Sequence, residues 1–309
     1  MSGADQVHTS TEGGFDAGEV IIGHVSNSSL EHPILQLPTL FGIDFSITKH
    51  VLMLWIVATL VFVAITWTVR KYLKKEDPVP SGFMTVLEMV VQFIRDSIVL
   101  PNVGKKYLNT WTPLILTFFF FIFSANAIGL FPIFDVLGVI NRFIFGGSAH
   151  DDSFVNSLLH GSTTATGNYN VTAGLATITF FAIILAGSKA HGFIKHWKNL
   201  APSGLAWPVY IILIPIEIIG MFVRPFALTM RLAANMTGGH IAILAIVSFV
   251  FIFAGLFNSA IAGISIGALV SVPLAVGISA LEIIIIIVQA YVFTMLTAVF
   301  IGMAINVHH

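Results

Sequence analysis

The feature that most constrains this chain is a long uncharged stretch near its end. Residues 232–281 contain no Asp, Glu, Lys or Arg, and a helix needs about 20 predominantly apolar residues to cross a membrane. Over the whole chain 56% of the residues are hydrophobic and 9% are charged, whereas a soluble domain carries about 25% charged residues. We therefore predict an all-α integral membrane protein.

Composition also excludes several classes of protein. The formal net charge is −1, and no basic patch has the density of a nucleic-acid-binding surface. Because the chain contains no cysteine, disulfides and thiolate metal sites are excluded. The histidines show no metal-ligand spacing, so we expect neither a metal nor a cofactor.

The N-terminal segment differs in composition from the rest. Residues 1–48 hold six acids and no Lys or Arg, which predicts a polar tail. The uncharged run Val51–Val69 is long enough for one span, and it is followed at once by Arg70, Lys71, Lys74 and Lys75. Since basic residues concentrate at cytoplasmic ends, the tail is predicted on the outer side, and residues 49–309 form the membrane domain.

The next apolar segment has too many polar positions for a span. Ser81–Leu100 is interrupted by Glu88, Gln92, Arg95 and Asp96. This mixture of apolar and polar positions is typical of a helix that lies at the membrane surface. We predict an interfacial helix here.

Two further spans are predicted at Tyr107–Phe134 and Val171–Ser188, joined by the polar segment Asp135–Asn170 on the outer side. Lysines 105 and 106 precede the first span, and lysines 189, 195 and 198 follow the second. These lysines indicate two cytoplasmic ends, in agreement with the first span. His191 and His196 lie among them and are expected in a solvated loop.

The last third of the chain is longer than simple spans require. Leu205–Leu256 as one helix would measure roughly 75–80 Å, against a hydrocarbon core of about 30 Å. The segment therefore either breaks into two spans or lies steeply tilted. Gly255–Gly267 is rich in small and polar residues and predicts a bend before a final helix, Pro273–Ile305. The whole is predicted to hold about five membrane helices, the last two forming a tilted hairpin.

The few polar residues of this region are regularly spaced. Glu217, Arg224 and Arg231 follow one another at intervals of seven, and Asn235 lies four beyond, so on a helix they share one stripe. On the final helix, Glu282 and Gln289 are also seven apart. Two facing helices would each present a polar stripe in an otherwise apolar wall.

The two arginines invite different interpretations. An Arg near the bilayer centre costs about 2.5–3.5 kcal/mol on insertion scales. Arg224 is expected to meet that cost by pairing with Glu217 or by reaching a headgroup. Arg231 has no nearby acid on its own helix, so its partner must be another helix, another subunit or water. His240 is either a packing residue or, with Glu282, part of a proton relay.

The segment Arg224-Pro-Phe-Ala-Leu-Thr-Met-Arg231-Leu-Ala-Ala-Asn235-Met-Thr-Gly-Gly-His240 resembles the signature of ATP synthase subunit a. In that family an Arg-Leu-x-x-Asn-Met core carries the essential arginine, which corresponds to Arg231. The family's polar positions also match those listed here: Glu217, Asn235, Gln289, and His240 with Glu282. A weaker match is Thr166-Gly-Asn-Tyr-Asn170-Val-Thr172, in which Asn168 stands where many relatives have an acid.

The resemblance implies a mechanism. Two aqueous half-channels, one open to each side, would serve a carboxylate on a rotating ring of small hairpin c subunits. Arg231 would separate the channels, because guanidinium stays charged and favours proton release from an approaching carboxylic acid. Glu217, Asn235, His240, Glu282 and Gln289 would line the path.

The resemblance also implies a setting for the chain. It would be a subunit without nucleotide chemistry of its own in the bacterial inner membrane, with the N-terminus outside and the C-terminus cytoplasmic. Its partners would be the ring, peripheral-stalk b subunits, membrane lipid and, indirectly, the soluble ATPase sector; no nucleic acid is expected.

Two alternatives remain at this point. A self-contained secondary transporter usually shows internal repeats and broken helices in both halves, whereas here the intramembrane charge lies in the C-terminal third. A membrane enzyme with a two-histidine haem or metal centre needs more than one intramembrane histidine, and His240 is the one convincing candidate.

Overall fold

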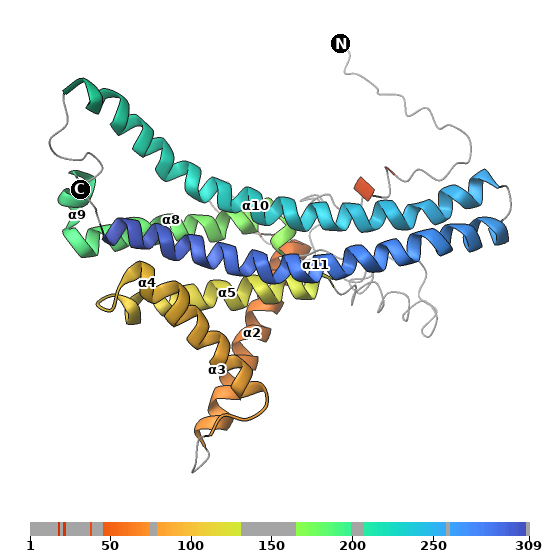
Figure 1. The fold of residues 1–309 in the computed structure, drawn as a ribbon, viewed down its shortest axis with the longest axis horizontal. Helices are drawn as coiled ribbons and strands as arrows, with labels where there is room; N and C mark the ends of the chain where they lie inside the picture. Colours follow the sequence, from red (N-terminus) through yellow and green to blue (C-terminus); the bar gives the residue numbers. More distant parts are fainter. Residues whose placement is uncertain are drawn as a thin grey trace. The chain divides into compact units, whose positions relative to one another are not determined.

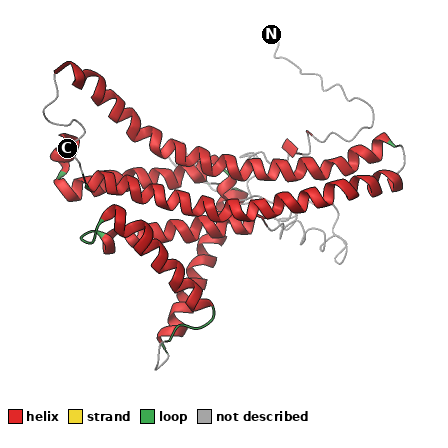
Figure 2. Cartoon of the chain, viewed as in Figure 1, coloured by secondary structure: helices red, strands yellow, loops and turns green. Residues whose placement is uncertain are grey.

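The computed structural model describes residues 18, 21, 22, 38, 46–74, 79–130, 165–198, 207–257 and 260–306. These residues are helical apart from short turns and caps (Figure 2). Five helices are long and apolar enough to cross a membrane. In chain order they are α2 (Lys49–Leu73), α5 (Leu108–Leu130), α8 (Tyr169–His191), α10 (Trp207–Leu256) and α11 (Ala260–Ile305) (Figure 1). The prediction of an all-α membrane protein is confirmed.

The first three long helices contain or closely match the predicted spans. α2 extends Val51–Val69 by two residues at its start and four at its end, and α8 similarly encloses Val171–Ser188. α5 ends at Leu130. The last four residues of Tyr107–Phe134, the acidic tail apart from isolated positions, and the predicted outer loop up to residue 164 lie outside the described residues.

The segment predicted as an interfacial helix is one helical run with a wider turn in its middle. α3 (Phe83–Phe93) leads into a π-helical stretch, η1 (Ile94–Val99), and then α4 (Leu100–Val103). It starts after Gly82, whose φ of 62° suits glycine. Arg95 and Asp96 stay exposed in η1. The run therefore carries one buried face, and its exposed face mixes these charges with apolar side chains such as Phe83 and Met89; its place at the membrane surface remains a prediction.

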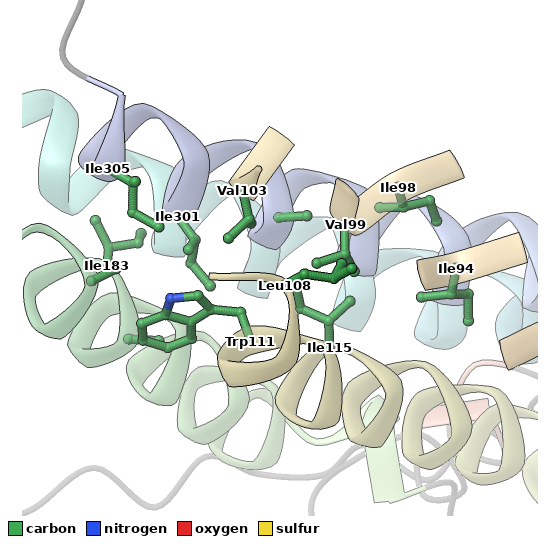
Figure 3. Packing of buried hydrophobic residues seen from close by; sticks show 13 residues of the cluster. Ile94, Ile98, Val99, Val103, Leu108, Trp111, Ile115, Ile183, Ile301 and Ile305 are labelled. Atoms are coloured by element: carbon green, nitrogen blue, oxygen red, sulfur yellow. The ribbon is translucent and has the colours of Figure 1, made fainter. Parts of the chain in front are cut away.

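The largest apolar cluster joins η1 and α4 to α5, α8 and the end of α11 (Figure 3). Ile94, Ile115 and Ile301 are fully buried there. Between helices in lipid the gain comes mainly from close van der Waals packing, so small residues matter. Gly302 is an example, because a Cβ at this position would collide with the carbonyl oxygen of Asn102.

The chain divides into two compact units. One contains residues 27–237 and 282–309 and holds α2 to α9, the first part of α10 and the last part of α11. The other contains residues 1–26 and 238–281, that is, the end of α10 and the start of α11.

α10 is a single helix of 50 residues, so the predicted alternative of two separate spans is wrong. At 1.5 Å per residue its path length is about 75 Å, more than twice the hydrocarbon thickness. Pro215 and Pro225 lie inside it, as membrane helices tolerate when neighbouring groups satisfy the freed backbone. Steep tilt in the membrane stays a prediction.

The start of the last helix was predicted wrongly. α11 begins at Ala260 rather than Pro273, and most of the predicted bend, Gly255–Gly267, is helical. The small residues serve packing instead of a turn. A Cβ on Gly267 would lie 2.6 Å from the Cα of Val250 on α10, so glycine permits the two helices of this unit to touch. Backbone groups without hydrogen bonds are costly in lipid, which favours a short connection between α10 and α11.

Candidate functional site

The polar stripe predicted on α10 contains one internally paired arginine. Arg224 donates a hydrogen bond from Nη2 to Oε1 of Glu217 at 3.2 Å, one heptad earlier. Its guanidinium also lies 5.7 Å from the centre of the Phe300 ring on α11, a favourable cation–π geometry. Arg224 therefore has the ion-pair partner expected from the sequence, and it ties α10 to α11.

Arg231, one heptad further along, has a different environment. Its side chain is exposed on this chain, while Leu228 and Leu232 beside it are buried in the cluster formed with α5, α8 and α11. Within the part of the chain that the structure describes, Arg231 has neither an ion pair nor a hydrogen bond. The apolar face of α10 is thus anchored, and the cation is presented outward in the middle of the helix.

Asn235 and Gln289 meet across the two long helices. The Asn235 Nδ2 donates to Gln289 Oε1 at 2.9 Å. Gln289 is buried. Asn235 is exposed and lies four residues after Arg231. The structure therefore brings together two candidates that are 54 positions apart in sequence, immediately next to the unpaired arginine.

Glu282 is buried at 2% exposure, and neither carboxylate oxygen has a hydrogen-bond partner among the described residues. A charged carboxylate is costly to bury without partners. His240 belongs to the other compact unit and has contacts of its own. The relay predicted between His240 and Glu282 thus stays a prediction.

The weaker match around Asn170 has a local structural explanation. Asn168 caps the start of α8, because its Oδ1 accepts a hydrogen bond of 2.8 Å from the Asn170 backbone N–H. Asn and Asp are equally good at this position, so Asn168 caps the helix as well as an acid would. The Asn170 side chain is exposed. Thr237 on α10 donates to the Gly167 carbonyl at 3.4 Å, which connects this turn to α10.

Sequence reasoning missed two polar contacts between segments. Thr166 donates a hydrogen bond to Asn126 of α5, and both are fully buried. Thr179 on α8 and Thr297 on α11 face each other at 3.4 Å between their hydroxyl oxygens and are also buried. A single Asn or Thr inside an apolar run is the available signal, but its partner depends on the tertiary fold.

The prediction of a solvated loop around His191 and His196 is wrong. His191 Nε2 lies 2.8 Å from the Ile305 carbonyl at the end of α11. His196, on α9 (Phe193–Lys198), is buried against Gly187 of α8, where a Cβ would collide with its ring. Burial, with a smaller effect of His191, holds the pKa of His196 below its ordinary 6.5. A short helix docked on α8 replaces the loop because glycine leaves room for the ring.

The residues that the structure describes contain no cluster of three His, Asp or Glu side chains arranged as metal ligands. The predicted ionisable and amide side chains lie instead along α10 and α11, and both helices are long enough to span a membrane. The fold and these residues define a polytopic integral membrane protein with ionisable groups within its long helices.

Comparison with known proteins gives the family. Residues 51–302 match the family described as the ATP synthase A chain. The chain is 41% identical over 296 residues to ATP synthase subunit a 2 of Chlorobium luteolum, covering 93% of this chain and 76% of that protein. It is 36% identical over 299 residues to ATP synthase subunit a of Pelodictyon phaeoclathratiforme, with 93% and 76% covered. For the subunit a of Anaeromyxobacter dehalogenans the identity is 35% over 322 residues, with 96% and 73% covered. This chain belongs to the ATP synthase subunit a family.

Proposed function

We propose that this chain is the proton-conducting stator subunit in the membrane sector of an F-type ATP synthase. It provides two offset aqueous half-channels, through which protons reach and leave a carboxylate on a rotating ring of small hairpin c subunits. Arg231 separates the two channels. The chain has no nucleotide chemistry of its own, and the soluble ATPase sector supplies that.

The observation that carries the proposal is the contrast between two arginines on one stripe. Arg224 has Glu217 at 3.2 Å, whereas Arg231 is exposed with no partner within the described ranges. An unpaired guanidinium at membrane depth is expensive. Its cost is met when a carboxylate of another subunit reaches it, and a ring acid passing this face of α10 is such a group.

The chemistry of guanidinium suits a barrier between channels. Guanidinium stays protonated at physiological pH, so it cannot release and rebind protons and cannot itself conduct them. Its fixed charge stabilises the ionised form of an approaching ring acid, which then releases its proton into one half-channel. A ring acid must be neutral to cross the lipid-facing arc, because a bare carboxylate there is costly. A proton therefore reaches the second half-channel only by travelling on the rotating ring.

The other polar residues of the stripe supply hydrogen-bonding positions along the path. Asn235 and Gln289 are joined next to Arg231, and the partnerless, buried Glu282 is suited to carry a proton. Glu217 lies two heptads before Arg231, and His240 nine residues after it. We propose that these five residues line the two half-channels, and that the exposed Asn170 has a secondary role at the outer side.

Sidedness and partners belong to the same proposal. The basic residues after α2, before α5 and at the end of α8 favour a cytoplasmic position for those ends. With five spans, the N-terminus is then outside and the C-terminus cytoplasmic in a bacterial inner membrane. Peripheral-stalk b subunits hold the chain still against the ring.

Purification from native membranes tests the proposal. The chain should co-purify with a very small apolar hairpin protein and with a soluble ATPase, and vesicles with the assembled complex should acidify when ATP is added. The control is the isolated chain in liposomes, which should not drive proton uptake coupled to any solute. Solute-coupled transport by the isolated chain, with no associated ATPase, would overturn the proposal in favour of a secondary transporter.

A further inference from the structure

An apolar cavity lies between α2, α3 and α5. Its volume is about 790 Å³, within the range of about 300–1,000 Å³ typical of small-molecule sites. In Figure 1 the three helices form the sides of a triangle, in which α2 and α3 meet at the ends joined by their linker. Apolar side chains dominate the lining, among them Ile65, Val69, Leu87, Leu116 and Phe120.

A second hollow lies beside this cavity and is lined by residues of α2 and its C-cap alone. It measures about 490 Å³ and shares Phe62 and Thr66 with the first. Beyond these two residues its lining becomes basic, with Arg70, Lys71 and Lys74. All three are exposed, at the end of a helix long enough to span the membrane. We call the two hollows together the α2 groove.

An aromatic residue stands at the boundary between the apolar and basic parts. Trp67 lines the second hollow, and the Lys71 ammonium lies 5.1 Å from the centre of its ring. Trp is enriched where the hydrocarbon core meets the headgroup region. The α2 groove thus combines an apolar cavity, an aromatic side chain and a cationic rim, which complement the acyl chain, glycerol region and phosphate of a phospholipid.

We infer that the α2 groove binds an anionic phospholipid, whose acyl chain fills the apolar cavity and whose phosphate contacts Arg70, Lys71 and Lys74. Each basic residue near an anionic membrane surface strengthens binding about fivefold. The basic cluster by itself would indicate only topology. The apolar cavity directly beside this cluster, with Phe62 and Thr66 lining both hollows, is what indicates a bound lipid.

Charge favours a lipid as the occupant. Three exposed cations line the second hollow, where they suit a phosphate, and the apolar cavity of about 790 Å³ has room for an acyl chain. Glu88 also lines the cavity and accepts a hydrogen bond from Gln92 at 3.3 Å, so the phosphate is favoured at the α2 end and not beside α3.

Photocrosslinking in the assembled complex tests the inference locally. Phe62, which lines both hollows, is replaced by benzoylphenylalanine, and the complex is placed in vesicles of equal parts phosphatidylglycerol and phosphatidylcholine. The crosslinked lipid is identified by mass spectrometry. We expect phosphatidylglycerol adducts to exceed phosphatidylcholine adducts about tenfold or more, and Arg70→Gln/Lys71→Gln/Lys74→Gln to return the ratio to that of the vesicle. Three charges correspond to a change of up to roughly 150-fold in relative affinity.

Matched variants separate this site from general lipid attraction. Benzoylphenylalanine at Trp55, an exposed α2 residue outside the groove, should report the vesicle ratio. Lys105→Gln/Lys106→Gln, which removes exposed cations elsewhere, should keep the enrichment at Phe62. Ala58→Trp fills the cavity and should abolish it, whereas the neighbouring Thr59→Trp should not. If Ala58→Trp does not assemble, the charge variant decides.

Four outcomes would overturn the inference. These are equal adduct yields for the two lipids at Phe62, enrichment that survives the triple Gln variant, full competition by millimolar inorganic phosphate, and adducts to a protein rather than to a lipid. The last would show that a partner helix occupies the groove. None of these outcomes depends on whether Arg231 has the role proposed for it, because no proton transport is measured.

Discussion

The side-chain amide of Asn235 donates a hydrogen bond of 2.9 Å to Gln289, which joins α10 to α11 one helical turn from Arg231. Gln289 is buried, and a buried amide without a partner would be costly. The bond therefore fixes the two long helices relative to each other at the point where the unpaired cation lies. Arg224, one heptad before Arg231, makes a second connection to α11 through its cation–π contact with Phe300.

The first prediction concerns this bond. Asn235→Ala and Gln289→Ala should be non-additive, with a coupling energy of about 0.6 kcal/mol and at most about 1.7 kcal/mol, the range for hydrogen bonds between membrane helices. Both single variants should also slow ATP-driven proton pumping, because the proposed path passes between them. The measurements are thermal stability of the complex and vesicle acidification, in a double-mutant cycle.

Thr179 and Thr297 provide the control for that cycle. Their hydroxyl oxygens lie 3.4 Å apart between α8 and α11, away from the polar stripe of α10. Thr179→Ala and Thr297→Ala should lower stability by a similar amount and leave pumping per assembled complex unchanged. Equal losses of pumping in both pairs would mean that Asn235 and Gln289 act on assembly rather than on the proton path.

The second prediction is the sidedness of α8. Asn170 is exposed in the first turn of α8, and Lys195 is exposed on α9 beyond its other end. α8 has 23 residues, about 35 Å, enough to cross the membrane once. Since the chain has no cysteine, Asn170→Cys should react with an impermeant thiol reagent from outside, and Lys195→Cys and Lys74→Cys from the cytoplasmic side. Labelling of positions 74 and 170 from the same side would contradict the topology.

The third prediction is a pH dependence in the docking of α9 on α8. His196 is buried against Gly187, and its pKa is held below 6.5, first by burial and second by His191. The undocked state binds the proton more tightly, so docking is fully stable above pH 6.5 and weakens as the pH falls through 6.5 toward the lowered value. Apart from Tyr169 at the opposite end of α8, the other titratable groups of α8 and α9 are basic: Lys189, His191, Lys195 and Lys198.

Hydrogen exchange of residues 192–198 at pH 7.5 and pH 5.5 measures this effect. Exchange should be faster at the lower pH in the wild-type chain, after correction for the intrinsic rate. His196→Phe keeps a ring against Gly187 and removes the proton, so the pH dependence should disappear. Gly187→Ala should undock α9 at both values. A His196→Phe variant with an undiminished pH response would assign the effect to His191 instead.

The sequence predicts well what depends on local pattern and poorly what depends on contact between distant segments. Uncharged runs bounded by lysines predicted the spans now seen as α2, α5 and α8, because the membrane requires that composition. The intervals of seven between Glu217, Arg224 and Arg231 predicted one stripe, since helix geometry is fixed. The partner of Arg224 followed from the same geometry.

The remainder required tertiary information. Glycine and serine before Pro273 predicted a bend, yet Gly267 serves close approach to Val250, which composition cannot distinguish. The burial of His196 depends on the absence of a side chain at Gly187, nine residues earlier. The bond between Asn235 and Gln289 spans 54 positions, and the resemblance to a family gave both residues without pairing them.

The last prediction tests the centre of the proposed function. Arg231→Ala should abolish ATP-driven acidification and ATP synthesis while the complex stays assembled, because the side chain is exposed and contributes no ionic or hydrogen-bonding contact to the described part of this chain. The loss should be on the order of 100-fold or more, as for removal of one preorganised charge at a reacting site. Passive proton leak should rise, since the charge between the half-channels is gone.

Arg231→Lys and Arg224→Ala make the test specific. These two variants and Arg231→Ala are measured by vesicle acidification, with a blot for the assembled complex. Arg231→Lys should also be severely impaired, because an ammonium lacks the planar fork of donors and gives up its proton more readily in an apolar site. Arg224→Ala removes an equal charge from the same stripe and loses the contacts to Glu217 and Phe300. It should therefore lower stability and reduce pumping only mildly. Normal pumping by assembled Arg231→Ala would remove the centre of the proposal, and a complete loss in assembled Arg224→Ala would assign the separating charge to the other arginine.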